Sequence, residues 1–410
     1  MHSVNVDTRI SNVLIMDRRK FIKNSALASS LCFVPSFVKA FESVATENLG
    51  YKRLVIIQLA GGNDGLNTII PHNNDFYFNA RPRLAITKDI IKLNDDLGFH
   101  PSLAPIRGLF DNGELSIINN VGYPNPVRSH FRSMDIWQTA SGSNEYLQSG
   151  WLGRYLDAHG EKPYNAIEMD EQLSLAMKGE HFNGIATSDY KVLHNTSKDP
   201  YFKNVINHYN DAHLSEHNLG YLYQTMIEAK SSANYIYENT KVKLSQEEYP
   251  QNKFAKQLKN VAQFINSDLD TKVFYTSLNG FDTHANQPYK QKRLLSQYAH
   301  SVSAFVKDLK RNETFEDTLI LTFSEFGRRL KQNAANGTDH GAANNVFIIG
   351  KNLKKAGFYN NLASLDDLDD IGDLKYEIDF RSIYATILSK WMKVSPDGII
   401  QSNPKNLNFI

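Results

Sequence analysis

The chain has 410 residues, of which 41% are hydrophobic and 22% are charged, and its formal net charge at pH 7 is +1. This length and composition support a large buried core, in one large domain or two small ones, and argue against intrinsic disorder. The near-zero net charge excludes a general electrostatic attraction to nucleic acid or to acidic membranes, so no nucleic-acid partner is expected.

A basic stretch followed by a short apolar stretch lies near the N-terminus. Residues 17–23 read DRRKFIK, residues 25–38 are mostly apolar, and Val38-Lys39-Ala40 offers a small-residue cleavage site. The apolar stretch is too short for a standard membrane span, so the pattern predicts a signal peptide over residues 1–40 and no stable membrane insertion after cleavage. The arginine pair resembles the twin-arginine export signal and predicts a periplasmic or otherwise exported protein. Met16 is a possible true start, and the alternative interpretation is an ordinary amphipathic N-terminal helix.

Cys32 is the only cysteine of the chain, and it lies inside the predicted signal. A lipoprotein signal has a small residue directly before the lipidated cysteine, but Leu31 precedes Cys32, so lipidation is not expected. The mature chain would then carry no thiol, which excludes disulfides and cysteine catalysis and leaves oxygen and nitrogen ligands for any metal ion.

Apolar runs that predict strands alternate along the chain with stretches that predict helices. The strands are expected over residues 53–60, 115–121, 272–278, 318–323 and 346–349, and the helices over residues 103–110, 129–140, 287–310 and 381–392. This alternation favours an α/β domain over residues 41–410, with a largely parallel central sheet and helices on both faces. Residues 150–270 are predicted to form a partly helical cap or insertion. The acidic residues 366–373 are expected to form a solvated loop, with cation binding as the alternative.

Polar side chains follow four of the predicted strands at the point where each strand ends. In chain order they are Asp64, Ser129, Asp282, His284, Glu325, Asp339 and His340. Ligands of an open α/β sheet bind outside the carboxyl ends of its strands, so we expect these side chains to converge. Carboxylates and imidazoles without thiolate suit one or two divalent ions, with Zn or Mn favoured over Ca or Mg.

A hydroxyl near such ions can act as a nucleophile, and Ser129 at the start of a predicted helix is the candidate, with His130 as a lesser one. Arg128 would neutralise the oxygens of an anionic ester. Plainer explanations stay open, because Asp64 would also suit a turn, Ser129 would also cap its helix, and Glu325 would also pair with a nearby arginine in a structural salt bridge.

Seven short motifs in a fixed order resemble a known bacterial family. They are GGNDGLNT, HPSLAPIRGLF, RSHF, GWLGR, FDTH, SEFGR and GTDHG. They look like the "domain of unknown function 1501" family, an uncharacterised family that is usually exported by the twin-arginine route and is grouped with the alkaline phosphatase and sulfatase superfamily. The resemblance covers nearly the whole mature chain and implies that superfamily's fold.

The resemblance also implies roles for single residues. The superfamily's metal ligands would fall on Asp64, Asp282, His284, Glu325 and His340, and its nucleophile on Ser129.

Two departures from the superfamily pattern are visible in the sequence. Asp282 and His284 stand closer together than the corresponding pair usually does, and Phe326 stands where a histidine commonly follows the carboxylate. Asp339 and His340 would then be the displaced Asp-His pair, or His340 would bind the metal ion that the histidine missing after Glu325 usually binds. Either the site binds one ion or its geometry has been rebuilt.

Two classes of function fit these observations. The first is an exported, metal-dependent hydrolase that acts on phosphate or sulfate esters of small molecules or glycans through a metal-activated serine. The second is a non-catalytic binding or assembly protein on the same fold with a degraded site. The retained acidic and histidine residues favour the first class, and the departures favour the second.

Overall fold

The computed structural model describes residues 51–200, 218–240, 243–402 and 404–410. The predicted signal peptide, its arginine pair and its cleavage site lie outside these residues. Within the described part of the chain, no helix is both long enough and apolar enough to cross a membrane.

A mostly parallel sheet forms the centre of the structure. Its order is β13-β5-β12-β9-β1-β8-β6-β7, and β14 also pairs with β5. The strands are β1 (Arg53–Ala60), β5 (Leu115–Gly122), β6 (Ala166–Glu168), β7 (Ile185–Ala186), β8 (Val273–Asn279), β9 (Thr318–Phe323), β12 (Asn344–Ile349), β13 (Gly357–Phe358) and β14 (Ile378–Asp379). Only β12 runs antiparallel to its neighbours among the described strands of this sheet, so the predicted fold class is confirmed.

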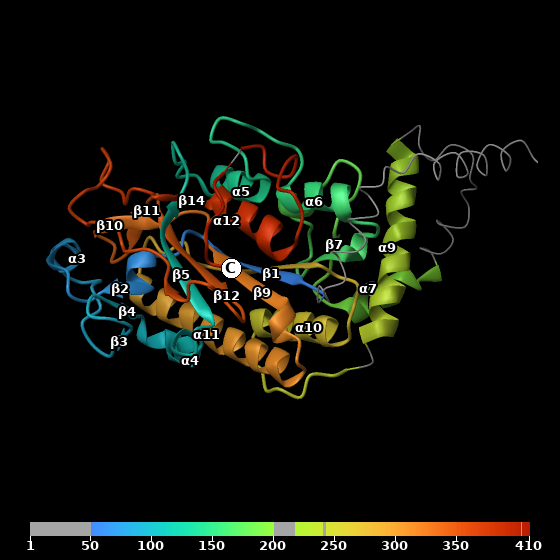
Figure 1. Cartoon of the computed structure of the whole chain (residues 1–410), viewed down its shortest axis with the longest axis horizontal. Coiled ribbons are helices and arrows are strands. Elements are labelled where there is room, and N and C mark those ends of the chain that lie inside the picture. The colour runs from blue at the N-terminus through green and yellow to red at the C-terminus, as the bar shows by residue number, and fades with distance from the viewer. Residues whose placement is uncertain (1–50, 201–217, 241–242, 403) are drawn as a thin grey trace, which may run out of the picture. The chain divides into compact units, whose positions relative to one another are not determined.

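Helices cover both faces of this sheet (Figure 1). One face packs against η2 (Pro101–Ile106), α4 (Arg107–Asp111), α10 (Lys253–Asn266) and α11 (Gln287–Arg311), and the other against α5 (His130–Thr139), α6 (Trp151–His159) and α12 (Phe380–Thr386). Alternate residues of β1 enter the two cores: Val55 and Ile57 belong to the first, Leu54 and Ile56 to the second. A strand buried on both faces needs this continuous apolar run, which is why RLVIIQLA is readable as a strand.

The other elements are short or peripheral. They are η1 (Gly65–Asn67), β2 (Ile69–Pro71), α3 (Asp75–Ala80), β3 (Ile91–Lys92), β4 (Leu97–Phe99), η3 (Pro163–Asn165), η4 (Leu175–Met177), α7 (Tyr190–Ser197), α9 (Asn218–Thr240), η5 (Phe315–Asp317), β10 (Arg328–Gln332), β11 (Thr338–His340) and the π-helical η6 (Ile387–Trp391). β2, β4 and β3 form a small separate sheet, and β10 and β11 form a hairpin. The segment 150–270, predicted as a cap or insertion, adds β6 and β7 to one edge of the central sheet and α10 to one of its faces.

Candidate metal centre

Five chain segments deliver side chains to one edge of the central sheet. β1, β5, β8 and β9 are parallel, so their carboxyl ends lie together. The antiparallel β12 begins at that same edge, and the β10–β11 hairpin that precedes it therefore returns His340 to the carboxyl ends of the other strands. Strand polarity alone thus explains why residues so far apart in sequence meet.

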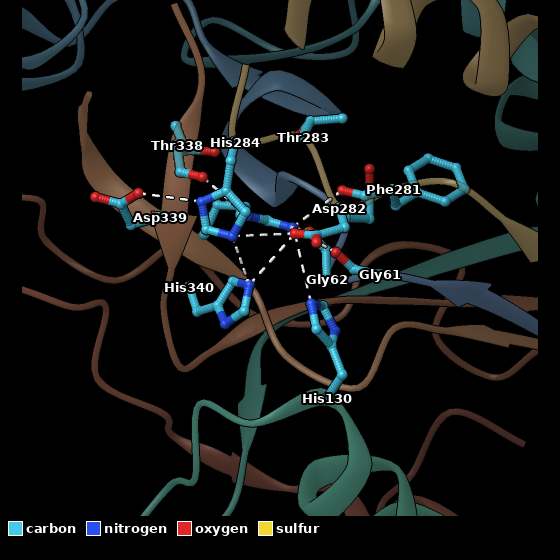
Figure 2. A network of polar contacts seen from close by, with 12 residues as sticks. Gly61, Gly62, His130, Phe281, Asp282, Thr283, His284, Thr338, Asp339 and His340 are labelled. Carbon is cyan, nitrogen blue, oxygen red and sulfur yellow. Dashed lines mark hydrogen bonds and ion pairs between the residues drawn. The ribbon is translucent and has the colours of Figure 1, made fainter. Parts of the chain in front are cut away.

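One carboxylate oxygen, Oδ1 of Asp282, is the centre of the cluster (Figure 2). The Nε2 atoms of three histidines surround it, at 3.4 Å for His130, 3.1 Å for His284 and 3.3 Å for His340. The Nε2 atoms of His284 and His340 are 2.8 Å apart. Three imidazoles therefore converge, through the same ring atom, on a single oxygen.

Each of these histidines is oriented by an oxygen at its other ring nitrogen, Nδ1. Nδ1 of His130 lies 2.9 Å from Oε1 of Glu325, which also accepts from the backbone N–H of Gly61 at 2.8 Å. Nδ1 of His284 lies 3.2 Å from Oδ1 of Asp339. For His340 the acceptor is a backbone carbonyl, that of the residue before Ser129, at 2.7 Å.

These contacts fix the tautomers of the three rings. A backbone carbonyl only accepts, so Nδ1 of His340 carries the proton and its Nε2 presents a lone pair. Glu325 and Asp339 impose the same assignment on His130 and His284. Two Nε2 lone pairs 2.8 Å apart repel each other unless a proton or a cation lies between or beside them.

A divalent ion fits this arrangement better than a proton does. Ligand atoms bound tetrahedrally to Zn²⁺ at about 2.0–2.1 Å are separated by about 3.3 Å, close to the 3.1–3.4 Å found around Asp282. His130, Asp282 and His340 form a group whose ligand atoms all lie within 4.8 Å of one another, and Nε2 of His284 adds a fourth donor on one side. Nε2 of His130 is buried and makes no hydrogen bond to any described residue. A buried ring nitrogen that lies beside a carboxylate without a hydrogen-bond partner is compatible with a metal ligand.

The buried guanidinium of Arg328 keeps Asp282 ionised. Burial raises the pKa of Asp282, but the hydrogen bond and charge of Arg328, whose NH2 atom lies 2.8 Å from Oδ1, outweigh it and hold the pKa at about 2. The hydrogen bond to Glu325 raises the pKa of His130, whereas burial lowers that of His340. The site therefore offers an ionised carboxylate at any physiological pH, as a metal centre requires.

The predicted ligand Asp64 lies apart from this group. Its side chain is fully buried, and its carboxylate is bound by Arg81 at 2.6 Å, by Gln287 at 2.5 Å and by the backbone N–H of Leu66 at 3.2 Å. Asp64 thereby caps η1 and neutralises a buried arginine. These contacts agree with the plainer interpretation of Asp64 as a turn residue. Asp64 is not among the residues that converge on Asp282.

Ser129 and Arg128 stand at the N-terminal end of α5. The Ser129 side chain is exposed and makes no capping hydrogen bond, although the residue is the N-cap of the helix. The Arg128 guanidinium forms ion pairs with two carboxylates of the acidic segment 366–373, namely Asp369 at 3.2 Å and the buried Asp373. An anion at this place would compete with those two carboxylates for Arg128.

His130 has a larger role than that of the lesser nucleophile predicted from the sequence, because its imidazole stands opposite Glu325. Glu325 was predicted as a metal ligand, with a structural salt bridge to a nearby arginine as the alternative. The nearby arginine, Arg328, pairs with Asp282. Phe326, which stands where the superfamily pattern has a histidine, packs against the rings of His130 and His340, with ring centroids 4.9 and 4.7 Å away. The motif RSHF, which places a histidine at a strand-to-helix turn, was the available signal for His130.

The family described as "Protein of unknown function (DUF1501)" matches residues 51–395. The chain belongs to this family. The match spans the described central sheet and every residue of the candidate metal centre of this DUF1501 protein, which confirms the resemblance at the family level. No curated protein matches the chain.

Solved structures similar to this DUF1501 protein have low identity to it. The C-terminal periplasmic domain of EcEptC from Escherichia coli shares 13% identity over 89% of each chain, with a TM-score of 0.40, and a Zn complex of that domain shares 11% over 73% of each chain at 0.33. The phosphonate monoester hydrolase SpPMH from Silicibacter pomeroyi shares 8% identity over 87% of this chain and 76% of its own, at 0.39. The PsFucS1 sulfatase from Pseudoalteromonas sp. shares 11% over 86% and 70%, also at 0.39.

Proposed function

We propose that this DUF1501 protein is an exported, metal-dependent hydrolase of phosphate or sulfate esters. The observation that carries the proposal is the convergence of three imidazole Nε2 atoms on Oδ1 of Asp282, with every Nδ1 atom held by an oxygen. Three or four nitrogen and oxygen donors without thiolate suit Zn first and Mn second, and Ca or Mg less well.

In the proposed site, His130, Asp282 and His340 hold the ion, and His284 is the fourth donor. A bound divalent ion would act as a Lewis acid that polarises the ester and lowers the pKa of a nearby hydroxyl. Glu325 and Asp339 hold the rings of His130 and His284 in the tautomer that binds a metal, as carboxylates behind ligating histidines do.

Ser129 is the proposed nucleophile because its hydroxyl is exposed at the N-terminus of a ten-residue helix and is not used as a cap. The free N–H groups of that first turn favour the negative charge of the ester. Attack by Oγ would form a bond to phosphorus or sulfur while the bond to the ester oxygen breaks, and the alcohol would leave with the proton of the serine. Water would then cleave the serine ester, releasing phosphate or sulfate and restoring the hydroxyl.

Elemental analysis of the purified mature protein tests the metal. We expect at least one Zn or Mn per chain in the wild type and loss of that ion from His130→Gln and His340→Gln, with the fold retained. His300→Gln, at an exposed position on α11, is the matched control and should keep the ion. Wild-type protein that contains no divalent ion and cannot be reconstituted with one would refute the proposal.

Turnover of aryl phosphates, phosphodiesters and aryl sulfates tests the nucleophile. Ser129→Ala should lower kcat by orders of magnitude and leave metal content unchanged. Because Ser129 makes no capping hydrogen bond, the variant should also lose less than the ~1 kcal/mol of stability that a capping serine contributes. Wild-type kcat in Ser129→Ala would remove this residue from the mechanism. No turnover of any substrate by metal-loaded wild type would favour the non-catalytic binding protein.

A further inference from the structure

A second concave site lies between the small β2-β4-β3 sheet and the segment that follows β13. The cavity has a volume of about 350 Å³, within the range of small-molecule pockets. Its polar lining consists mainly of asparagines, namely Asn73, Asn74, Asn94, Asn360 and Asn361. None of the residues that line it belongs to the metal centre.

Two of these asparagines, the half-buried Asn74 and the exposed Asn94, have amide oxygens that are fixed by the backbone. Oδ1 of Asn94 accepts from the backbone N–H groups of Asp96 at 3.0 Å and Leu97 at 2.7 Å. Oδ1 of Asn74 caps α3 by accepting from the backbone N–H of Tyr77 at 3.3 Å. Backbone N–H groups only donate, so they settle which end of each amide is oxygen. Neither amide nitrogen donates a hydrogen bond to another group in the described part of the chain.

A third asparagine makes one wall rigid. Asn360 is hydrogen bonded twice to the edge of β5, since its Oδ1 accepts from the N–H of Asn119 at 2.8 Å and its Nδ2 donates to the carbonyl of Asn119 at 3.0 Å. The side chain of the exposed Asn361 has no such bond among the described residues. The cavity thus combines fixed amides with one that is free to adapt.

The rest of the lining is apolar or carries little charge. Leu97, Phe358 and Leu362 provide apolar surface, and Asp96 supplies the one formal charge among the described lining residues. A purely apolar ligand would leave the amide donors without water or partner, which costs about 1–3 kcal/mol for each buried group. A strongly charged ligand would find no set of opposite charges.

We propose that this cavity binds an uncharged sugar residue. Sugar hydroxyls both donate and accept, so they match primary amides, and the C–H face of the ring packs on aromatic and aliphatic side chains. Sugar binding at this cavity would require neither a bound metal nor ester hydrolysis. The protein would then bind a neutral glycan at a site separate from the candidate metal centre.

Titration of the full mature protein with defined sugars tests this site. The probes are glucose, galactose, mannose and the neutral β-1,4- and α-1,4-linked trisaccharides of glucose, followed by calorimetry and by saturation-transfer NMR. At least one probe should bind, and removing the bound metal with a chelator should not change its affinity. That second arm separates this site from the metal centre.

Asn74→Asp and Asn94→Asp are the sharpest variants. Aspartate keeps the oxygen that accepts from the backbone but replaces the donor nitrogen by a second oxygen, so the local turn is retained and the proposed ligand contact is lost. Loss of one such hydrogen bond should weaken binding about tenfold in each variant. Asn79→Asp makes the same change at an exposed position of α3 outside the cavity and should bind like wild type.

Ala363→Phe provides an independent variant, because it fills the cavity without removing a polar group and should abolish binding. The proposal is overturned if no probe binds at about 10 mM, a concentration near the weakest useful affinities. It is equally overturned if Asn74→Asp, Asn94→Asp and Ala363→Phe all bind like wild type.

Discussion

Glu325 illustrates how a buried carboxylate can orient a histidine of the candidate metal centre without itself contacting Asp282. It is almost fully buried, and one of its oxygens accepts both from the backbone of Gly61 and from Nδ1 of His130. The other oxygen lies 3.3 Å from the hydroxyl of Ser324. The contacts of Glu325 thus assign it a positioning role: it fixes the ring of His130, and His130 presents Nε2 to the site.

We therefore expect Glu325→Gln to lower the metal affinity about 10- to 100-fold while the fold is retained. An amide can still accept from Gly61, but it lacks the charge that holds the Nδ1 proton of His130. The affinity is measured by competition with a chromophoric zinc chelator. Glu114→Gln, at a buried glutamate paired with Lys310 elsewhere in the structure, is the matched control. An unchanged affinity in Glu325→Gln would show that His130 needs no such partner.

At the scale of secondary structure, the β10–β11 hairpin is what completes the site. Its anchor is Arg328, whose side chain is fully buried. The guanidinium donates to the carbonyls of Gly61, Gly62, Phe281 and Thr338 and to the carboxylate of Asp282. It therefore ties together the loops after β1 and β8 and the hairpin itself.

Arg328→Met should destabilise the protein by about 3–5 kcal/mol, because it leaves buried carbonyls and one carboxylate without their donor. Urea unfolding measures this loss. Arg329→Met, one residue along on the same strand and 39% exposed, should change stability far less. Equal effects of the two substitutions would contradict the anchoring role of Arg328.

The sequence predicts the long elements well and the short ones poorly. β9 has the predicted bounds, residues 318–323, and α11 extends only one residue beyond the predicted end, since each carries a long, regular apolar pattern. β6, β7, β13 and β14 have two or three residues each, too few to show a period, and they exist because the sheet edge offers partners. The β10–β11 hairpin that returns His340 is not among the predicted strands, because RRLKQ carries no alternation of apolar and polar residues.

The same limit applies to the candidate site. Strand ends predicted Asp282, His284 and His340 as neighbours, because a parallel sheet gathers its carboxyl ends whatever the loops do. Sequence does not show which carboxylate faces which ring nitrogen, so Glu325 and Asp339 could not be distinguished from direct ligands. Asp64 has the right place along the chain, but its partner Arg81 is recognisable only in three dimensions.

For the whole molecule, the buried ionisable groups decide how stability depends on pH. Glu168, at the end of β6, is 4% exposed, and one of its oxygens accepts from the backbone N–H of Ser174 at 2.7 Å. Burial raises the pKa of Glu168 from its ordinary 4.5 to about 7. Because the folded protein holds this proton more tightly than the unfolded chain does, the Glu168 contribution favours folding below about pH 4.5 and is lost as the pH rises from 4.5 to 7.

Glu168→Gln should remove this pH-dependent loss, since an amide stays neutral and still accepts from Ser174. The shift corresponds to an upper limit of about 3 kcal/mol, so the variant should be more stable than wild type at pH 8, with the gain vanishing toward pH 4.5. Urea unfolding of both proteins between pH 4.5 and pH 8 measures the difference, and the exposed Glu171→Gln is the control for loss of one negative charge nearby. A stability difference between Glu168→Gln and wild type that does not change over this range would mean that Glu168 does not titrate there. Any constant difference in stability between the two proteins would then come from changed packing or hydrogen bonding at position 168, not from the protonation of Glu168.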